Sequence, residues 1–246
     1  DVTIASVDGA TPLYGTLRIQ WTLKTNRPQP TTFYEETKYL DLMELMLQKG
    51  ADPNARLQKN LWYIGYNFAL ERNNSSGTTA FWKAAAVGDL NGMRLLIKYG
   101  ADSTISSIEG GTPLLIASGA GFHGNDSVTT SLGRMPTVKY LVEELGANVN
   151  QADTGLPKDP NAEDNQARRR GPSGGRTALH NAAGRGDNEM ILYLVSKGAR
   201  LGAVAKNGQT VADMANGSRQ RVQPYQETLA LLDILGARNN HKCVSC

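Results

Sequence analysis

The end of the chain carries the residue pattern with the clearest capacity for chemistry, His241-Lys242-Cys243-Val244-Ser245-Cys246. A Cys-x-x-Cys pair can form a redox disulfide, supply two zinc ligands or begin a c-type haem attachment site. The haem motif requires a histidine directly after the second cysteine, and a structural zinc site requires four ligands. Because neither signature is complete, we expect no cofactor, and we keep haem or zinc bound through His241, Cys243 and Cys246 as the alternative.

A second candidate site is the most aromatic run of the chain, residues 61–68, which holds Trp62, Tyr63, Tyr66 and Phe68. Aromatic side chains with polar tips are favoured at protein-interaction hot spots. The competing interpretation is that these rings fold back over the helices beneath them, because a long insertion usually needs an apolar anchor of its own.

A third candidate is the triplet Arg168, Arg169 and Arg170, within a stretch rich in Pro, Gly, Asn and Asp. Three adjacent guanidinium groups can hold a phosphate or an acidic partner. Acidic residues precede the triplet and balance its charge, so a solvated loop is the simpler interpretation.

Composition limits the remaining functional classes. The net charge of +3 comes from 26 basic and 23 acidic residues, which does not favour a nucleic-acid partner. Polar residues interrupt every apolar run before it reaches the length of a membrane span. No nucleophile, base and acid set accompanies a histidine, so we expect no enzyme activity.

The elements that must position these candidates recur along the chain. A Gly-x-Thr marker begins at Gly9, Gly77, Gly110, Gly175 and Gly208, and two of the intervals are 33 residues long. The other two intervals, from Gly9 to Gly77 and from Gly110 to Gly175, are longer and therefore require insertions. After Thr177, Leu179, Ala182 and Ala183 share one helix face, and a second apolar helix follows from Met190. Such short helices need neighbours of the same kind, so the pattern predicts a stack of helix pairs.

These residues resemble ankyrin repeats. Thr112-Pro113-Leu114 and Thr177-Ala178-Leu179-His180 carry the first half of that pattern, and Gly100-Ala101-Asp102 carries the second. The resemblance implies an all-α solenoid of about five helix-turn-helix units, with structural roles for Thr112, Thr177 and His180. It also implies a non-catalytic scaffold that binds an unidentified protein through finger insertions and its concave face.

The overall style of the chain resembles bacterial ankyrin proteins of the cell envelope. A periplasmic location follows from that resemblance. The alternative function is an extracytoplasmic redox or haem-linked module that uses Cys243 and Cys246. Since residues 1–13 parallel residues 102–114, we also expect an upstream repeat before Asp1.

The predicted division treats the chain as one solenoid. It consists of the end of an upstream repeat (1–8), repeat one (9–57), the aromatic insertion (58–76), repeat two (77–109), repeat three (110–152), a loop (153–174), repeat four (175–207), a capping repeat (208–237) and the cysteine tail (238–246).

Overall fold

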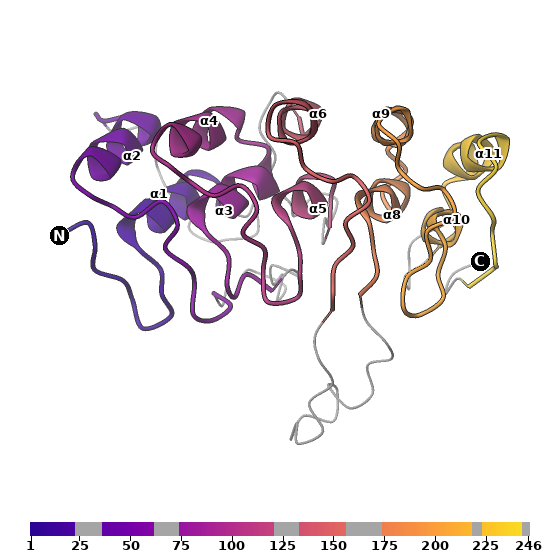
Figure 1. The fold of residues 1–246 in the computed structure, drawn as a ribbon, viewed down its shortest axis with the longest axis horizontal. Coiled ribbons are helices and arrows are strands. Elements are labelled where there is room, and N and C mark those ends of the chain that lie inside the picture. Colours follow the sequence, from indigo (N-terminus) through magenta and orange to yellow (C-terminus); the bar gives the residue numbers. More distant parts are fainter. Residues whose placement is uncertain (23–35, 62–73, 121–132, 156–173, 218–222, 243–246) are drawn as a thin grey trace, which may run out of the picture. The chain divides into compact units, whose positions relative to one another are not determined.

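The computed structural model describes residues 1–22, 36–61, 74–120, 133–155, 174–217 and 223–242, which fold into pairs of short helices (Figure 1). The pairs are α1 (Pro12–Gln20) with α2 (Tyr39–Gln48), α3 (Ala80–Val87) with α4 (Leu90–Lys98), α5 (Pro113–Ala117) with α6 (Met135–Lys139) and its continuation η4 (Tyr140–Glu144), α8 (Ala178–Ala183) with α9 (Asn188–Ser196), and α10 (Val211–Ala215) with α11 (Gln226–Ile234). These residues contain no strand apart from an isolated bridge between Val204 and Thr210. The predicted all-helical fold of about five helix pairs is confirmed.

The chain forms two compact units. Unit 1 contains Asp1–Ile108 and Thr112–Ala147, and unit 2 contains Glu109–Gly111 and Asn148–Cys246. Within unit 1, α1 packs against α2 and α3, and α3 packs against α4 and α5. Within unit 2, α8 packs against α9 and α10, and α10 packs against α11. The repeat boundaries given above stay a prediction.

The Gly-x-Thr marker is the start of the first helix in each pair. The threonine hydroxyl of Thr11, Thr79, Thr112 and Thr210 accepts the backbone N–H three residues later, at 3.1–3.4 Å. This bond satisfies one of the donors that a helix N-terminus leaves unpaired. Thr177 is the N-cap of α8 and forms a capping box with His180. Local capping therefore explains why the marker recurs.

The extended segment before each first helix, called here the finger, is joined to the next finger by backbone hydrogen bonds. In unit 1, Gln58 N–H donates to Asp8 at 2.8 Å and Ile108 N–H donates to Ser76 at 3.0 Å. In unit 2, Thr154 N–H donates to Glu109 at 2.8 Å and Lys206 N–H donates to Gly174 at 2.9 Å. These bonds form a ladder across the fingers of each unit.

Two asparagines reinforce the stack in the same way. Asn54 donates to Gly100 O and accepts from Asp102 N–H, at 2.9 and 2.7 Å. In unit 2, Asn150 donates to Gly198 O and accepts from Arg200 N–H, at 2.9 and 2.8 Å. Each side-chain amide thus ties one repeat to the next with both its donor and its acceptor.

The turn of π-helix η4 accommodates one extra residue in the second helix of pair three. Ala147 N–H donates to Leu141 O at 2.8 Å, whereas Ala101 N–H donates to Leu96 O at 3.0 Å across a segment one residue shorter. Because the bulge absorbs the insertion, Leu141 stays buried, as Leu96 does.

Candidate functional site

The predicted aromatic insertion leaves unit 1 through a closed neck. Ser75 N–H and Oγ both lie 2.8 Å from Asn60 Oδ1, and Leu61 N–H donates to Ser75 Oγ at 3.3 Å. Ser75 and Leu61 are buried, and Leu61 packs with Tyr14. The described residues on the two sides of segment 62–73 therefore lie next to each other in the folded body.

The predicted contact residues Trp62, Tyr63, Tyr66 and Phe68 lie outside the described residues. The outer parts of the predicted 58–76 segment do not. Gln58 and Ser76 both take part in the finger ladder, so they belong to the folded scaffold.

The Arg-bearing segment has a similar neck in unit 2. Asp153 N–H donates to Arg176 O at 3.0 Å, and Gly175 N–H donates to Asp153 O at 2.8 Å. The Asp153 carboxylate also accepts Arg176 N–H at 2.7 Å. Burial raises the pKa of Asp153, while the N–H and charge of Arg176 act against that rise. Arg168, Arg169 and Arg170 lie outside the described residues.

The fingers of unit 1 expose apolar side chains on a fixed backbone. Ile4 is 65 % exposed, Val7 90 % and Ile108 53 %. Val7 and Ile108 hold the same position, two residues before Gly9 and Gly110. The sequence analysis missed this shared apolar position, although an alignment of the two finger sequences displays it.

Arg56 holds the fingers of unit 1 in register. Its Nε donates to Gly77 O at 2.7 Å, and its Nη2 donates to Ser106 O at 3.1 Å. Beside it, a cleft of about 340 Å³ opens between the first finger and residues 52–58. The cleft is lined by Val2, Thr3, Ala5, Ser6, Gly9, Thr11, Asp52, Ala55, Arg56 and Gln58.

The first helices of pairs two and three, α3 and α5, contribute little exposed surface. Every residue of α5 is buried, and α3 is buried except at Ala86, which is half-buried. Thr112 caps α5 and is itself buried. On α1, by contrast, Ile19 is exposed. A partner of unit 1 would therefore meet the fingers and the end of α1 rather than α3 or α5.

Asp89 binds two aromatic residues, one on each side of segment 23–35. Trp21 Nε1 donates to Asp89 Oδ2 at 3.0 Å, and Tyr39 OH donates to Oδ1 at 3.1 Å. The two rings meet edge to face at 5.9 Å. Burial raises the pKa of Tyr39, and the charge and hydrogen bond of Asp89 raise it further. The sequence analysis above does not identify this role of Asp89.

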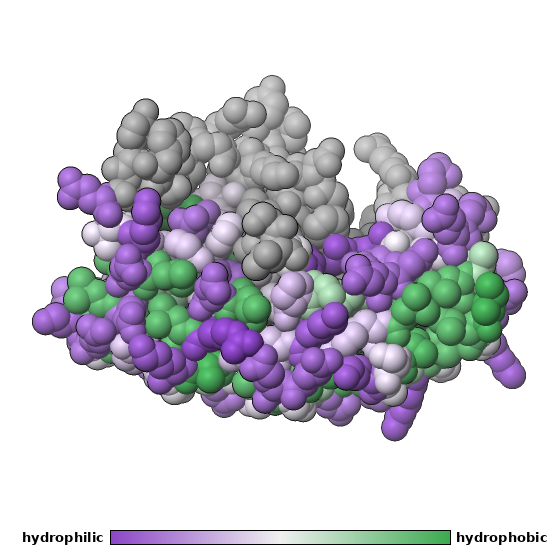
Figure 2. Space-filling model, turned by 90° about the horizontal axis from the view of Figure 1, so that it is seen from above, coloured by the Kyte–Doolittle hydropathy of each residue, from purple (hydrophilic) through white to green (hydrophobic). Residues whose placement is uncertain are grey.

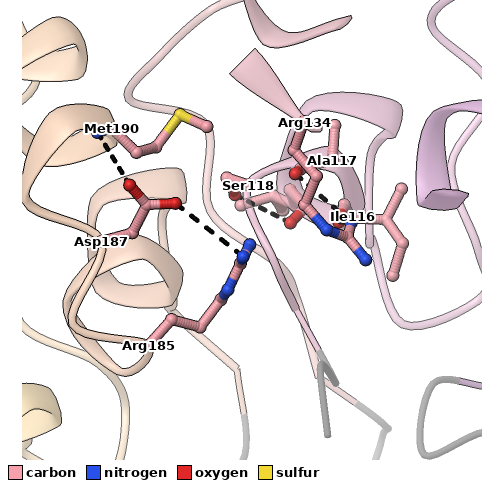
Figure 3. Close-up of polar contacts among 8 residues, drawn as sticks. Ile116, Ala117, Ser118, Arg134, Arg185, Asp187 and Met190 are labelled. Carbon is pink, nitrogen blue, oxygen red and sulfur yellow. Dashed lines mark hydrogen bonds and ion pairs between the residues drawn. The ribbon is translucent and has the colours of Figure 1, made fainter. Parts of the chain in front are cut away.

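Segment 121–132, between α5 and α6, is followed by the buried Arg134. Its Nη1 donates to Ile116 O at 3.2 Å and to Ala117 O at 3.4 Å, at the end of α5 (Figure 3). A charged donor at these carbonyls satisfies acceptors that the end of a helix leaves open. The neck of this insertion is thus held by the guanidinium.

His180 is fully buried at the start of α8. Thr177 N–H donates to His180 Nδ1 at 3.1 Å, so Nδ1 carries no proton and Nε2 carries one. No acceptor meets Nε2 with hydrogen-bond geometry among the described residues. Burial lowers the pKa of His180 to about 4, and the backbone of Gln209 and of Ala203 opposes this only in part.

We expect His180 to make unit 2 sensitive to acid. Below pH 6.5 the His180 imidazole binds a proton in the unfolded chain, whereas in the folded chain it stays neutral down to about pH 4. The free energy of unfolding therefore falls as the pH is lowered through that window. At pH 5 the loss is about 2 kcal/mol. In His180→Gln, the glutamine carbonyl can keep the capping box without titrating. Urea unfolding of both proteins at pH 7.5 and pH 5 should show a smaller pH dependence in the variant, and an equal dependence would contradict the assignment.

The polar tail 238–242 lies along the last finger and is held by Asp213. This fully buried carboxylate accepts Asn240 N–H at 2.9 Å, Lys242 N–H at 3.3 Å and Thr210 N–H at 2.9 Å. Thr210 Oγ1 also donates to Arg238 O at 2.7 Å. Asp213 occupies the position that His180 holds in the previous repeat.

Of the predicted site formed by His241, Cys243 and Cys246, the structure describes His241. His241 is exposed, with a positive φ of 54°, and its N–H donates to Asn239 Oδ1 at 2.9 Å. Cys243 and Cys246 lie outside the described residues. Over the part that is described, no three His, Cys, Asp or Glu side chains are grouped so that they could hold a metal ion. In the same part, every helix is too short or too polar to cross a membrane.

Comparison with known families identifies one stretch directly. Residues 174–203 match the family model of the ankyrin repeat. They contain α8, α9 and the capping box of Thr177 and His180. The match and the stacked helix pairs together support the predicted ankyrin-repeat solenoid, and ankyrin repeats generally mediate protein–protein interactions without catalysis.

Proposed function

We propose that the chain is a non-catalytic scaffold that binds a protein partner through its finger insertions, its exposed fingertips and the open part of its concave face. The observation that carries the proposal is the closed neck of each finger insertion, at Asn60 and Ser75 in unit 1 and at Asp153 and Arg176 in unit 2. A neck of this kind lets a segment vary in sequence while the scaffold beneath it stays folded.

In unit 1, the proposed binding surface combines the aromatic insertion with the exposed Ile4, Val7 and Ile108, and with Ile19 on α1. Apolar side chains on a hydrogen-bonded backbone lose little conformational entropy when a partner covers them. Trp62, Tyr63, Tyr66 and Phe68 would supply the main anchors.

In unit 2, the proposed contact is the segment that carries Arg168, Arg169 and Arg170. Guanidinium groups pair with carboxylates in a bidentate geometry, so this segment suits an acidic patch of the partner.

The test is to shorten each finger insertion without disturbing its neck. Replacing residues 62–73 by an Asn-Gly turn, or residues 156–173 by the same turn, leaves the neck hydrogen bonds in place. Each shortened protein should keep its helical circular dichroism and its melting temperature. Affinity capture from the source organism should then recover the partner with the full chain and not with the shortened proteins.

Residues 121–132 provide the matched control, because this segment has the same length as 62–73 but joins two helices of one pair. Its replacement should leave capture unchanged. In the chain with its full-length insertions, the double substitution Trp62→Ala plus Tyr66→Ala should reduce capture of the partner. Undiminished capture by both shortened proteins would refute the proposed surface.

A further inference from the structure

The first finger of unit 1 closes as a small hairpin. Ser6 N–H donates to Ala10 O at 2.9 Å, and Gly9 N–H donates to Ser6 O at 2.8 Å. Ala5 is exposed and comes directly before this hairpin. Its methyl side chain leaves the space beside the hairpin open. The cleft of about 340 Å³ described above lies there, with Ala5, Ser6 and Gly9 among its lining residues.

The second finger closes through the same two hydrogen bonds. Leu57 N–H donates to Thr78 O at 2.9 Å, and Gly77 N–H donates to Leu57 O at 2.8 Å. Arg56 comes directly before this hairpin, so it holds the position that Ala5 holds in the first finger. An arginine and an alanine thus occupy equivalent positions of the repeated backbone.

The two gaps between successive fingers are matched as well. One ladder bond crosses each gap, from Gln58 N–H to Asp8 O in the first and from Ile108 N–H to Ser76 O in the second. The donors hold equivalent positions in their fingers, and so do the acceptors. The backbone around the first gap is therefore arranged like the backbone around the second.

The second gap is occupied by the guanidinium group of Arg56. Its Nε donates to Gly77 O at 2.7 Å in its own finger, and its Nη2 donates to Ser106 O at 3.1 Å in the next finger. Because the two gaps are equivalent, the matching carbonyls around the first gap are those of Gly9 and Arg56, and both residues line the cleft. The first gap thus offers acceptors for a guanidinium group, and the methyl group of Ala5 supplies no donor to them.

A carboxylate adds a negative charge to the cleft. Asp52 is an exposed lining residue whose Oδ1 accepts Asn54 N–H at 2.8 Å. Among the ion pairs of the described residues, none includes Asp52. Arg56 also lines the cleft, but its guanidinium group is bound in the second gap. One carboxylate beside two carbonyls suits a planar cation with several N–H donors.

The carboxylates on the outer helices of unit 1 are engaged differently. Glu44 pairs with Lys98 at 2.6 Å, and Glu144 pairs with Arg94 at 2.6 Å. Figure 2 shows the outer helices from above, with hydrophilic residues interleaved with hydrophobic ones over unit 1. Since cations of the chain itself pair with Glu44 and Glu144, Asp52 is better placed to receive a cation from another molecule.

We propose that the cleft between the first two fingers binds the guanidinium group of an arginine of the protein partner, in the place that corresponds to that of Arg56 in the next gap. The carbonyls of Gly9 and Arg56 accept its N–H groups, and the Asp52 carboxylate balances its charge. The inference rests on the proposed function only for the source of the arginine, because the affinity of the cleft for a guanidinium group can be measured without the partner.

The probe is N-acetyl-arginine amide, titrated into the full chain while the backbone amides of Ser6, Gly9 and Gln58 are followed by NMR. We expect saturable shifts of these amides with a dissociation constant on the order of 5 mM, because a single ion pair and two hydrogen bonds form close to solvent. N-acetyl-citrulline amide has a similar shape but no charge, and it should bind at least about fivefold more weakly.

Two arginine substitutions test the position of the site. Ala5→Arg should fill the cleft from within and abolish binding of the probe, because the new side chain starts from the position that corresponds to Arg56. Val7→Arg is the matched control, since Val7 is 90 % exposed on the same finger and is not a lining residue of the cleft. This variant should bind the probe as the wild type does. Circular dichroism verifies that both variants are folded.

Two carboxylate substitutions test the charge. Asp52→Asn should weaken binding of the probe about fivefold, as expected for an ion pair close to solvent. Asp102→Asn is the matched control, because Asp102 holds the same position in the third finger and its Oδ1 likewise accepts a backbone N–H at 2.8 Å, from Thr104. Its substitution should leave binding unchanged.

A titration without saturable shifts, equal affinity for the citrulline probe, or probe binding that survives in Ala5→Arg overturns the cleft as a guanidinium site. Such a result leaves the scaffold function itself standing, because the shortened insertions test that function separately. Affinity capture addresses the source of the arginine. Ala5→Arg should recover less partner than the wild type, and undiminished capture overturns the assignment of the arginine to the partner.

Discussion

Replacing Asp89 by alanine is expected to destabilise unit 1 by about 3 kcal/mol and to lower its melting temperature by roughly 10 °C. The carboxylate is 2 % exposed and accepts three hydrogen bonds, from Trp21 Nε1, Tyr39 OH and Gly92 N–H. Alanine removes all three acceptor sites, and each buried donor left unpaired costs free energy. Thermal unfolding followed by circular dichroism measures the loss.

Asp187 supplies the matched control for this prediction. It occupies the same position in pair four, where it caps α9 through Met190 N–H at 3.1 Å and lies 3.8 Å from Arg185 (Figure 3). Its side chain is 27 % exposed and receives no aromatic donor in the described part of the chain. Asp187→Ala should therefore cost only about 1 kcal/mol, the usual value of an N-cap. Equal losses in the two variants would show that Asp89 is no more than a cap.

Asp89→Asn separates the contributions at this site. The amide oxygen can still accept from Gly92 and Tyr39, but the amide nitrogen would face the Trp21 N–H donor. We expect the free energy of unfolding of this variant to lie between those of the wild type and the alanine variant. Introducing Trp21→Phe into the Asn variant should then add little further loss, because the clashing donor is gone.

Asp213→Ala is expected to release the tail and to cost about 2 kcal/mol. The change removes the acceptor of Asn240 N–H, Lys242 N–H and Thr210 N–H, whereas the bonds from Thr210 Oγ1 to Arg238 O and from Gln209 Nε2 to Lys242 O do not depend on Asp213. Hydrogen exchange should show the Asn240 and Lys242 amides losing protection at least tenfold, on the order of the free energy of the lost bonds.

Asp213→Asn distinguishes tail docking from helix capping. One oxygen of Asp213 accepts from both tail amides and the other accepts from Thr210. The asparagine oxygen can keep the tail bonds while the capping bond is lost. The Asn240 and Lys242 amides should stay protected from hydrogen exchange in Asp213→Asn and should lose that protection in Asp213→Ala. Unchanged exchange in Asp213→Ala would remove Asp213 from the docking of the tail.

Three of the insertions share one structural feature, a neck of hydrogen bonds at the point where each leaves the folded body. Asp89 joins residues on the two sides of segment 23–35, Asn60 and Ser75 are joined across segment 62–73, and Asp153 and Arg176 are joined across segment 156–173. Each neck brings the described residues that flank an insertion close together. The repeat framework can therefore carry long segments while the spacing of its helix pairs is preserved.

The sequence by itself determined the helix pairs and their starting points. The Gly-x-Thr marker and the apolar spacing after Thr177 act within a few residues, and N-capping by Thr11, Thr79, Thr112 and Thr210 is a local interaction. Local interactions can be inferred from a single sequence because both partners lie in the same short window.

Only the tertiary structure decided which distant polar groups meet. Asp89 receives Trp21 and Tyr39 from 68 and 50 residues away, and Asp213 receives a tail amide from 29 residues away. The sequence predicts a capping last repeat, but it does not predict that α11 exposes Ile234. Exposure and long-range bonding depend on how the helices stack, and periodicity alone does not specify which face of the last helix meets solvent.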